Sequence, residues 1–153
     1  MSIRARYVHT NLIARNWRAL ADFYINVFGC VPVPPERDLS GPEMEAGTGL
    51  PSPHLRGMHL RLPGGGETGP TLEILNYKTL RDRPAPEANA TGFGHLAFSV
   101  KDVEAARAEV LSAGGAAVGK VVTVDPGSDV LITWCYVRDP EGNILELQSS
   151  RKK

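Results

Sequence analysis

Apolar residues recur with regular spacing along the chain, and the spacing switches between that of strands and that of helices. Residues 5–13 predict a strand, with Val8 and Leu12 on one face and His9 and Asn11 on the other. Beyond Asn16, a favourable helix N-cap, apolar residues recur at helical spacing until Gly29, where a helix commonly ends. Three further strands are predicted after this helix, at residues 30–33, 57–62 and 70–77. The first half of the chain is therefore predicted to form a βαβββ unit.

The second half of the chain repeats this order of elements. Residues 93–100 predict a strand, Asp102 is a candidate N-cap, and a glycine pair ends the helix that follows it. Three strands complete the half, near residues 117–124, at 130–138 and at 144–148.

The two halves also agree in their internal spacing. His9 precedes Gly29 by 20 residues, and His95 precedes Gly115 by the same 20 residues. We therefore expect an α+β fold built from two βαβββ modules within one domain of residues 1–153. The expected boundaries are 5–78 for the first module, 79–92 for a linker rich in proline and alanine, and 93–150 for the second module.

One insertion distinguishes the first half from the second. It adds about a dozen residues before the last strand of the first module, and its place is predicted at residues 37–55, which are rich in proline and glycine. This composition predicts a loop, which is either a lid over a binding site or an ordinary surface excursion.

Composition excludes several classes of protein. The 17 basic and 17 acidic residues balance, which argues against a nucleic-acid binder. No apolar run approaches the roughly 20 residues that span a bilayer, and the first six residues lack the apolar stretch of an export signal. Cys30 and Cys135 have no CxxC spacing, so we expect buried free thiols and a cytoplasmic location.

Each module carries a histidine on its first strand and a glutamate on its last. These residues are His9 and Glu73 in the first module, and His95 and Glu146 in the second. Since strand side chains alternate between faces, all four point away from the most apolar face of their strand, which is expected to pack under the helix. Two histidines and two carboxylates that line one cavity have the composition of a metal site, and a divalent cation would remove the repulsion between the carboxylates.

Taken singly, each of these residues has an ordinary explanation. A histidine in a half-buried strand is commonly only hydrogen-bonded, and a glutamate in an alternating strand commonly faces solvent. The metal hypothesis depends on the repetition of both residue types at equivalent positions. On the same criterion, His54 and His59 are predicted not to be ligands, because neither has a histidine counterpart in the other module.

Several short motifs, in this order and spacing, resemble those of the vicinal-oxygen-chelate (glyoxalase-like) superfamily. The segments that carry the resemblance are residues 7–12, 22–24, 28–29, 72–75, 94–98 and 139–147. The resemblance implies a curved mixed sheet around a metal cavity, helices on the outer face, and a homodimer that acts on a small molecule.

The two-histidine, two-glutamate set resembles that of glyoxalase I, and methylmalonyl-CoA epimerase is similar. The resemblance implies one divalent ion (Ni, Co, Zn, Mn or Fe) held by His9, Glu73, His95 and Glu146. It further implies a lyase or isomerase that stabilises an enediolate or enolate of a 2-oxo or acyl-thioester substrate. Asn11 stands where an arginine would help to hold glutathione, which argues against that substrate.

The resemblance leaves the general base open. Either Glu146 or Glu73 could leave the metal and take the proton, as in glyoxalase I. A separate acid could serve instead, as in the epimerase; the candidates are Glu36, Glu43, Glu45 and Glu67. Three further residues share a strand face with the predicted ligands and are candidates for substrate contact, namely Asn11, Tyr77 and Gln148.

Two other functions fit the same motifs. One is a metal-dependent dioxygenase, for which the resemblance implies two histidines and one glutamate. The other is a resistance protein that binds a small molecule, as bleomycin-binding members do, without a metal and without catalysis.

Overall fold

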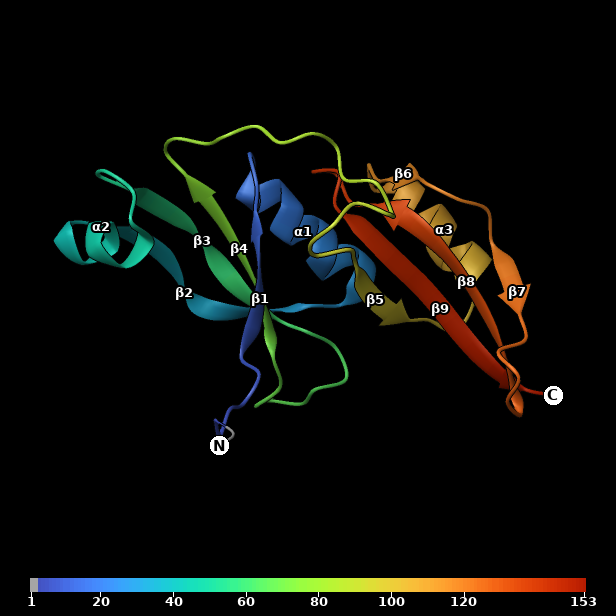
Figure 1. Cartoon of the computed structure of the whole chain (residues 1–153). Coiled ribbons are helices and arrows are strands. Elements are labelled where there is room, and N and C mark those ends of the chain that lie inside the picture. The colour runs from blue at the N-terminus through green and yellow to red at the C-terminus, as the bar shows by residue number, and fades with distance from the viewer. Residues whose placement is uncertain (1–2) are drawn as a thin grey trace. The chain divides into compact units, whose positions relative to one another are not determined.

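The computed structural model describes residues 3–153, and these fall into two compact units. Unit 1 ends at Asp82 and unit 2 begins at Arg83, within the segment predicted as a linker (Figure 1). Met1 and Ser2, the first of the residues considered for an export signal, lie outside the described part of the chain. Each unit has a mixed sheet and at least one helix of its own, which confirms the α+β class.

Unit 1 contains a four-stranded sheet in the order β1-β4-β3-β2. Its elements are β1 (His9–Ile13), α1 (Trp17–Phe28), β2 (Val31–Ser40), α2 (Pro42–Thr48), β3 (His54–Arg61) and β4 (Thr71–Tyr77). The first and last strands, β1 and β4, are neighbours and run parallel, whereas the other pairs are antiparallel.

Unit 2 repeats this topology with a five-stranded sheet in the order β5-β9-β8-β6, in which β7 also pairs with β8. Its elements are β5 (Leu96–Ser99), α3 (Val103–Ser112), β6 (Ala116–Ala117), β7 (Val122–Val124), β8 (Val130–Arg138) and β9 (Ile144–Lys152). Again the first and last strands, β5 and β9, are parallel neighbours.

The repetition extends to the strand register. In unit 1 the Cα partner of Glu73 on β1 is Asn11, and in unit 2 the Cα partner of Glu146 on β5 is Ala97. His9 lies two residues before Asn11, and His95 lies two residues before Ala97. Each histidine therefore has the same offset from the glutamate of the neighbouring strand.

Both helices begin as predicted. The Asn16 side chain accepts a hydrogen bond from the Ala19 amide, and the Asp102 side chain accepts one from the Ala105 amide. Gly29 ends α1 with φ of 68°, a left-handed conformation that glycine adopts without steric cost. The helix α1 packs on β3 and β4, and α3 packs on β8 and β9.

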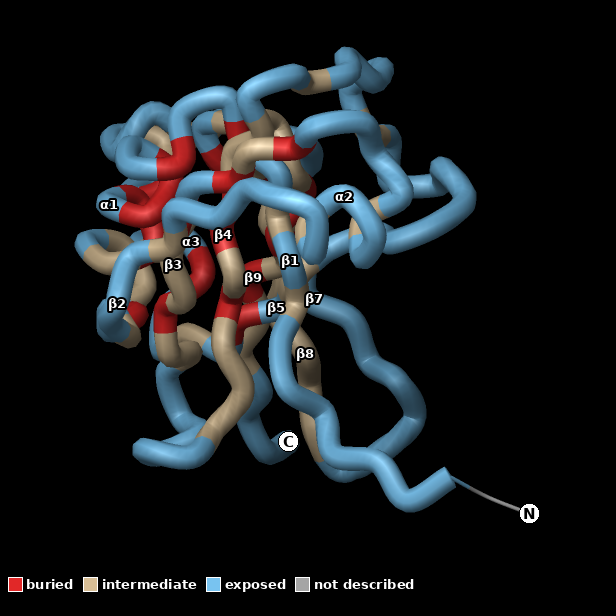
Figure 2. The backbone as a smooth tube through the Cα atoms, turned by 90° about the vertical axis from the view of Figure 1, so that its left-hand side faces the viewer, coloured by how far each residue is buried: buried red, intermediate tan, exposed pale blue. Residues whose placement is uncertain are grey.

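The core lies between these helices and the sheet faces beneath them (Figure 2). On β4, Leu72 and Ile74 are fully buried, and on β9 the same is true of Leu145 and Leu147. These residues alternate with Glu73 and Glu146, so the glutamates lie on the opposite faces of their sheets, as the alternation predicts. The two cysteines are buried free thiols, as expected.

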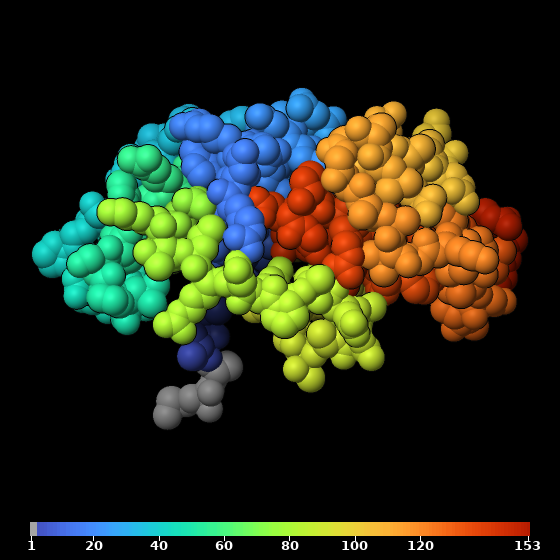
Figure 3. Space-filling view, turned by 90° about the horizontal axis from the view of Figure 1, so that it is seen from above, coloured from blue at the N-terminus to red at the C-terminus, as the bar shows by residue number. Residues whose placement is uncertain are grey.

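The prediction of a loop at residues 37–55 is wrong. The strand β2 continues to Ser40, and Pro42 begins the short helix α2, which lies at the edge of unit 1 (Figure 3, teal). Proline is favourable in the first turn of a helix, and Glu43 and Glu45 in the same turn complement the helix dipole. Proline and glycine therefore mark the ends of a helix here instead of an unstructured loop.

Other element boundaries differ from the predictions by a few residues. The first strand of each unit is shorter than predicted, and the last strand of unit 2 continues to Lys152. The segment predicted as one strand near 117–124 forms two short strands, β6 and β7. Among residues 3–153, none of the helices has both the length and the apolar character needed to cross a membrane.

Candidate functional site

Two histidines contact one glutamate on the face of the unit 1 sheet that points away from α1. The distance from His9 Nε2 to Glu73 Oε2 is 3.5 Å, and that from His59 Nε2 to Glu73 Oε1 is 3.0 Å. The imidazole rings of His9 and His59 are 5.3 Å apart and nearly perpendicular. The three residues come from the adjacent strands β1, β4 and β3, with the glutamate in the middle. We call this group the unit 1 cluster.

Neighbouring polar groups hold the cluster in place. The Thr71 hydroxyl lies 2.8 Å from Nδ1 of His59, and the Asn11 amide donates a 3.0 Å hydrogen bond to Glu73 Oε2. Burial lowers the pKa of His59; Glu73 opposes this shift, and the charges of Arg37 and His9 add to it. The neutral imidazole, with its proton on Nε2, fits both contacts: Nε2 donates to Glu73, and Nδ1 accepts from Thr71.

Unit 2 contains a related pair on the corresponding face of its sheet. The distance from His95 Nε2 to Glu146 Oε2 is 2.9 Å. The ring of Tyr136 lies 5.0 Å from that of His95, and the ring of Trp134 lies 4.9 Å from that of Tyr136. We call this group the unit 2 pair.

His59 and Tyr136 occupy the same position in the two units. The Cα partner of Glu73 on β3 is His59, and the Cα partner of Glu146 on β8 is Tyr136. His59, which was predicted not to be a ligand because it lacks a histidine counterpart, therefore contacts Glu73 and has its counterpart in Tyr136. The register of the β3–β4 hairpin, and not a residue type repeated in the other unit, places His59 beside Glu73.

The structure brings the four predicted ligands together as two pairs, one within each unit. The predicted substrate contact Asn11 lies beside Glu73 and donates to it. Tyr77 lies at the end of β4, opposite Leu55, and Gln148 lies on β9, opposite Trp134. Tyr77 lies four residues after Glu73, and Gln148 lies two residues after Glu146, so each shares the face of the glutamate of its strand.

Two other side chains considered from the sequence have partners elsewhere. His54 lies 2.5 Å from a carboxylate oxygen of Asp38. Glu36 accepts two hydrogen bonds from the Arg18 guanidinium, at 2.8 and 2.7 Å, and this contact lowers its pKa. Glu36 is thereby a poor candidate for the general base.

The donor atoms of both groups suit a divalent cation in chemistry and in spacing. Two atoms bound at 2.0–2.2 Å to one cation lie roughly 2.8 to 3.6 Å apart in octahedral or tetrahedral geometry. The His–Glu distances of 2.9, 3.0 and 3.5 Å fall close to this range. Within residues 3–153, however, no three or more His, Cys, Asp or Glu side chains are already placed to hold a metal ion.

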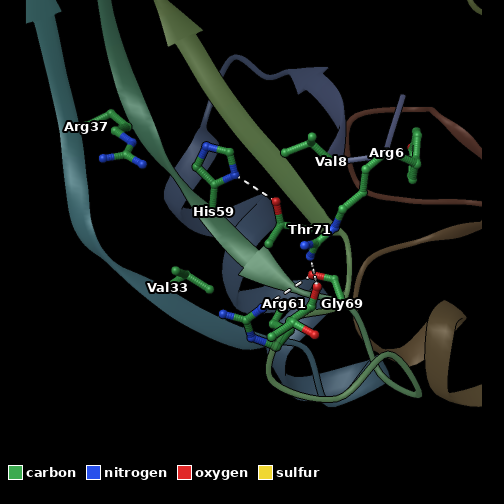
Figure 4. A pocket seen from close by; sticks show the side chains of 10 residues that line it. Arg6, Val8, Val33, Arg37, His59, Arg61, Gly69 and Thr71 are labelled. Atoms are coloured by element: carbon green, nitrogen blue, oxygen red, sulfur yellow. Dashed lines mark hydrogen bonds between the residues drawn. The ribbon is translucent and has the colours of Figure 1, made fainter. Parts of the chain in front are cut away.

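A cavity of about 480 Å³ lies beside the unit 1 cluster and is lined by residues of unit 1 alone (Figure 4). His59 and Thr71 form part of its wall, and three arginines, Arg6, Arg37 and Arg61, complete the polar part. The cavity therefore adjoins Glu73 through the imidazole of His59.

Solved structures with the same fold come from several bacteria. A glyoxalase family protein from Bacillus cereus superposes with a TM-score of 0.83 at 19% identity and covers 97% of this chain and 96% of its own. A glyoxalase family protein from Enterococcus faecalis has a TM-score of 0.56 at 26% identity, covering 95% and 96%. A glyoxalase/bleomycin resistance protein/dioxygenase family enzyme from Burkholderia phytofirmans has 0.60 at 16%, covering 95% and 98%.

Sequence comparison gives the same family. No curated protein sequence matches the chain. The family model described as Glyoxalase/Bleomycin resistance protein/Dioxygenase superfamily matches residues 6–147, which is nearly the whole chain and includes all four predicted ligands. The chain therefore belongs to the glyoxalase/bleomycin resistance protein/dioxygenase superfamily.

Proposed function

We propose that the protein is a divalent-metal-dependent enzyme that moves a proton on carbon, as a lyase or isomerase of a small 2-oxo or acyl-thioester substrate. The observation that carries the proposal is the repeated His–Glu pair, which has the same strand register in both units. Side chains that only faced solvent would not require the same register between histidine and glutamate in both units.

The proposed ligands are His9 and Glu73 of the unit 1 cluster, and His95 and Glu146 of the unit 2 pair. Imidazole and carboxylate donors suit Zn, Ni, Co, Mn and Fe(II). A bound cation would stabilise the negative charge that develops on the substrate oxygen when the neighbouring carbon loses its proton.

The general base is proposed to be Glu146. Glu73 is held by two imidazoles and by the Asn11 amide, whereas His95 is the one hydrogen-bond or ion-pair partner of Glu146 within residues 3–153. A carboxylate with fewer contacts can rotate toward the substrate more easily. One oxygen of Glu146 would take the proton from carbon and return it to the neighbouring carbon of an isomerised product.

The first experiment measures the metal content of the purified protein. The parent is expected to hold one equivalent of divalent metal, and His9→Ala and Glu73→Ala are expected to lose most of it. His54→Ala is the matched control, because it also removes an imidazole from the unit 1 sheet, but one that pairs with Asp38 and not with Glu73. A parent that copurifies with no metal and takes up none on reconstitution would overturn the proposal.

The second experiment follows the chemistry. A panel of 2-oxo acids and acyl thioesters is incubated with the metal-loaded protein in deuterated water, and exchange of the hydrogen next to the carbonyl is followed by NMR. Glu146→Gln keeps the size of the side chain but removes the base, so exchange is expected to fall by a factor of about 10² to 10⁴. Exchange at the parental rate in this variant would exclude Glu146 as the base.

A dioxygenase is the second candidate, and the unit 1 cluster is the observation that favours it. Two histidines and one carboxylate form the ligand set of many non-haem iron oxygenases. Consumption of oxygen that depends on added Fe(II) and fails with His59→Phe would support this function. Turnover under nitrogen would exclude it.

We further propose a homodimer in the cytoplasm. Family membership supports the dimer, and the buried free thiols of Cys30 and Cys135 suit a reducing compartment. Sedimentation equilibrium of the full chain tests the assembly, since a monomer at micromolar concentration would contradict it. Fractionation of the source cells tests the location.

A further inference from the structure

We propose that the cavity of unit 1 is a binding site for the carboxylate or phosphate group of a small organic anion, held by Arg6, Arg37 and Arg61. The part of the inference that assigns this site to the acidic group of the substrate rests on the proposed function. The part that assigns an anion-binding site depends only on the residues that line the cavity.

The strand register explains why these arginines share one cavity. Arg37 on β2 lies opposite Gly57 on β3, and Arg61 lies opposite Thr71 on β4, so both share the sheet face of His59. Arg6 reaches the same place from the segment before β1. Figure 4 shows the three side chains around the cavity, with His59 between Arg37 and Thr71.

The cavity arginines carry positive charge, and no carboxylate lines the cavity beside them. Among the ten residues that line the cavity there is no aspartate or glutamate. Within residues 3–153, none of the cavity arginines forms an ion pair, whereas other arginines of unit 1 do: Arg15 with Asp82, Arg18 with Glu36 and Arg56 with Asp38. Three guanidinium groups around one space repel each other, and a bound anion would remove that repulsion.

Two of these guanidinium groups are positioned by backbone carbonyls of the turn between β3 and β4. Arg6 donates to the Thr68 carbonyl, and Arg61 donates to the Gly69 carbonyl at 3.3 Å. Each guanidinium has five N–H donors, so these single bonds leave others for a ligand. Positioned guanidinium groups bind carboxylate and phosphate through paired hydrogen bonds.

The size and lining of the cavity indicate an organic anion. Its volume of about 480 Å³ is that of a small-molecule site. Val8 and Val33 supply apolar wall beside the arginines, which suits a short carbon skeleton. Since His59 joins this wall to Glu73, an acidic group held by the arginines would place that carbon skeleton near the unit 1 cluster.

The test measures binding of three probes to chelator-treated protein by calorimetry. Inorganic phosphate and pyruvate are the two anions, and methyl pyruvate is the uncharged control. The parent is expected to bind at least one anion and to bind methyl pyruvate more weakly. Tighter binding of phosphate would identify a site for a phosphate group, and tighter binding of pyruvate would identify a site for a carboxylate. Either result supports the inference.

Two substitutions and one control locate the binding. Arg37→Met and Arg61→Met are each expected to weaken anion binding about tenfold, since each removes charge-assisted hydrogen bonds. Arg56→Met is the control, because Arg56 lies on the same strand β3 but faces the other way and pairs with Asp38. Failure of both anions to bind, or unchanged affinity in both cavity variants, would overturn the inference.

A further variant separates this inference from the proposed function. Glu73→Gln removes a negative charge beside the cavity, so anion binding is expected to stay equal or become tighter while metal is lost. Anion binding by a parent protein that takes up no metal on reconstitution would refute the proposed function alone. Metal binding without any anion binding would refute the anion site alone.

Discussion

In unit 1 the glutamate of the last strand lies opposite a histidine, whereas in unit 2 it lies opposite a tyrosine. The strand order, the parallel pairing of first and last strands, and the His–Glu offset are the same in both units. His59 has a counterpart in Tyr136, and the arginine-lined cavity belongs to unit 1 alone. The comparison teaches that the repeated strand pairing fixes the offset between histidine and glutamate, while the neighbouring strand β3 or β8 determines which side chain lies opposite the glutamate.

The largest expected effect tests the equivalence of the two cores. Leu72 and Leu145 precede the two glutamates in sequence and are both fully buried. Leu72→Ala and Leu145→Ala are each expected to lower the free energy of unfolding by about 3 kcal/mol, as lost burial and a new cavity combine. Urea denaturation measures both variants. A loss below about 1 kcal/mol in either one would break the equivalence.

The turns before the last strands are expected to differ in stability. In unit 2 the buried carboxylate of Asp139 accepts hydrogen bonds from the amides of Glu141 and Asn143 and from the Asn143 side chain. Asp139→Ala is expected to cost about 2 kcal/mol in urea denaturation, because buried donors lose a charged acceptor. Glu67→Ala, in the exposed turn of unit 1, is the control and is expected to change stability by less than about 0.5 kcal/mol. Equal losses of stability in Asp139→Ala and Glu67→Ala would contradict this expectation.

The position opposite the glutamate sharpens the comparison at the site. His59→Phe removes an imidazole that contacts Glu73 at 3.0 Å, so metal affinity is expected to fall about tenfold, equivalent to about 1.4 kcal/mol. Tyr136→Phe keeps the ring beside His95, and its metal affinity is expected to change less than about threefold. Competition with a chromogenic chelator measures both. A larger effect from Tyr136→Phe would reverse the assignment of the two positions.

The smallest expected effect concerns the two thiols, one in each unit. Burial raises the pKa of Cys30 to about 11 and also raises that of Cys135. Neither is therefore expected to react with a thiol reagent at pH 8 until denaturant is added. Because the pKa of Cys30 is raised from 9.0, its contribution to stability is complete below pH 9 and is lost as the pH rises through about 11. Rapid reaction of one thiol in the native protein would contradict this.

The parts of the fold that depend on local chemistry could be predicted from the sequence. Asn16, Gly29 and Asp102 act within one helical turn of themselves, so their roles follow from residue type alone. Alternation along β4 and β9 likewise placed the glutamates on the face away from the helices. These predictions needed no knowledge of which strands pair.

The parts that depend on strand pairing could not be predicted in the same way. The meeting of His59 with Glu73 depends on the register of a hairpin, which a comparison of residue types between the halves does not contain. The arginine cavity depends on how β2 continues beyond Val33, where its pairing with β3 shifts. The proline and glycine residues at 37–55 led to the incorrect prediction of a loop. The same residue types also begin and end helices, and composition alone does not distinguish the two.

The parallel pairing of first and last strands has a consequence for the newly made chain. His9 is synthesised 64 residues before Glu73, and His95 is synthesised 51 residues before Glu146. Contacts of such long sequence separation form late and slowly in folding. On the ribosome each histidine therefore leaves the exit tunnel before the glutamate with which it pairs has been synthesised.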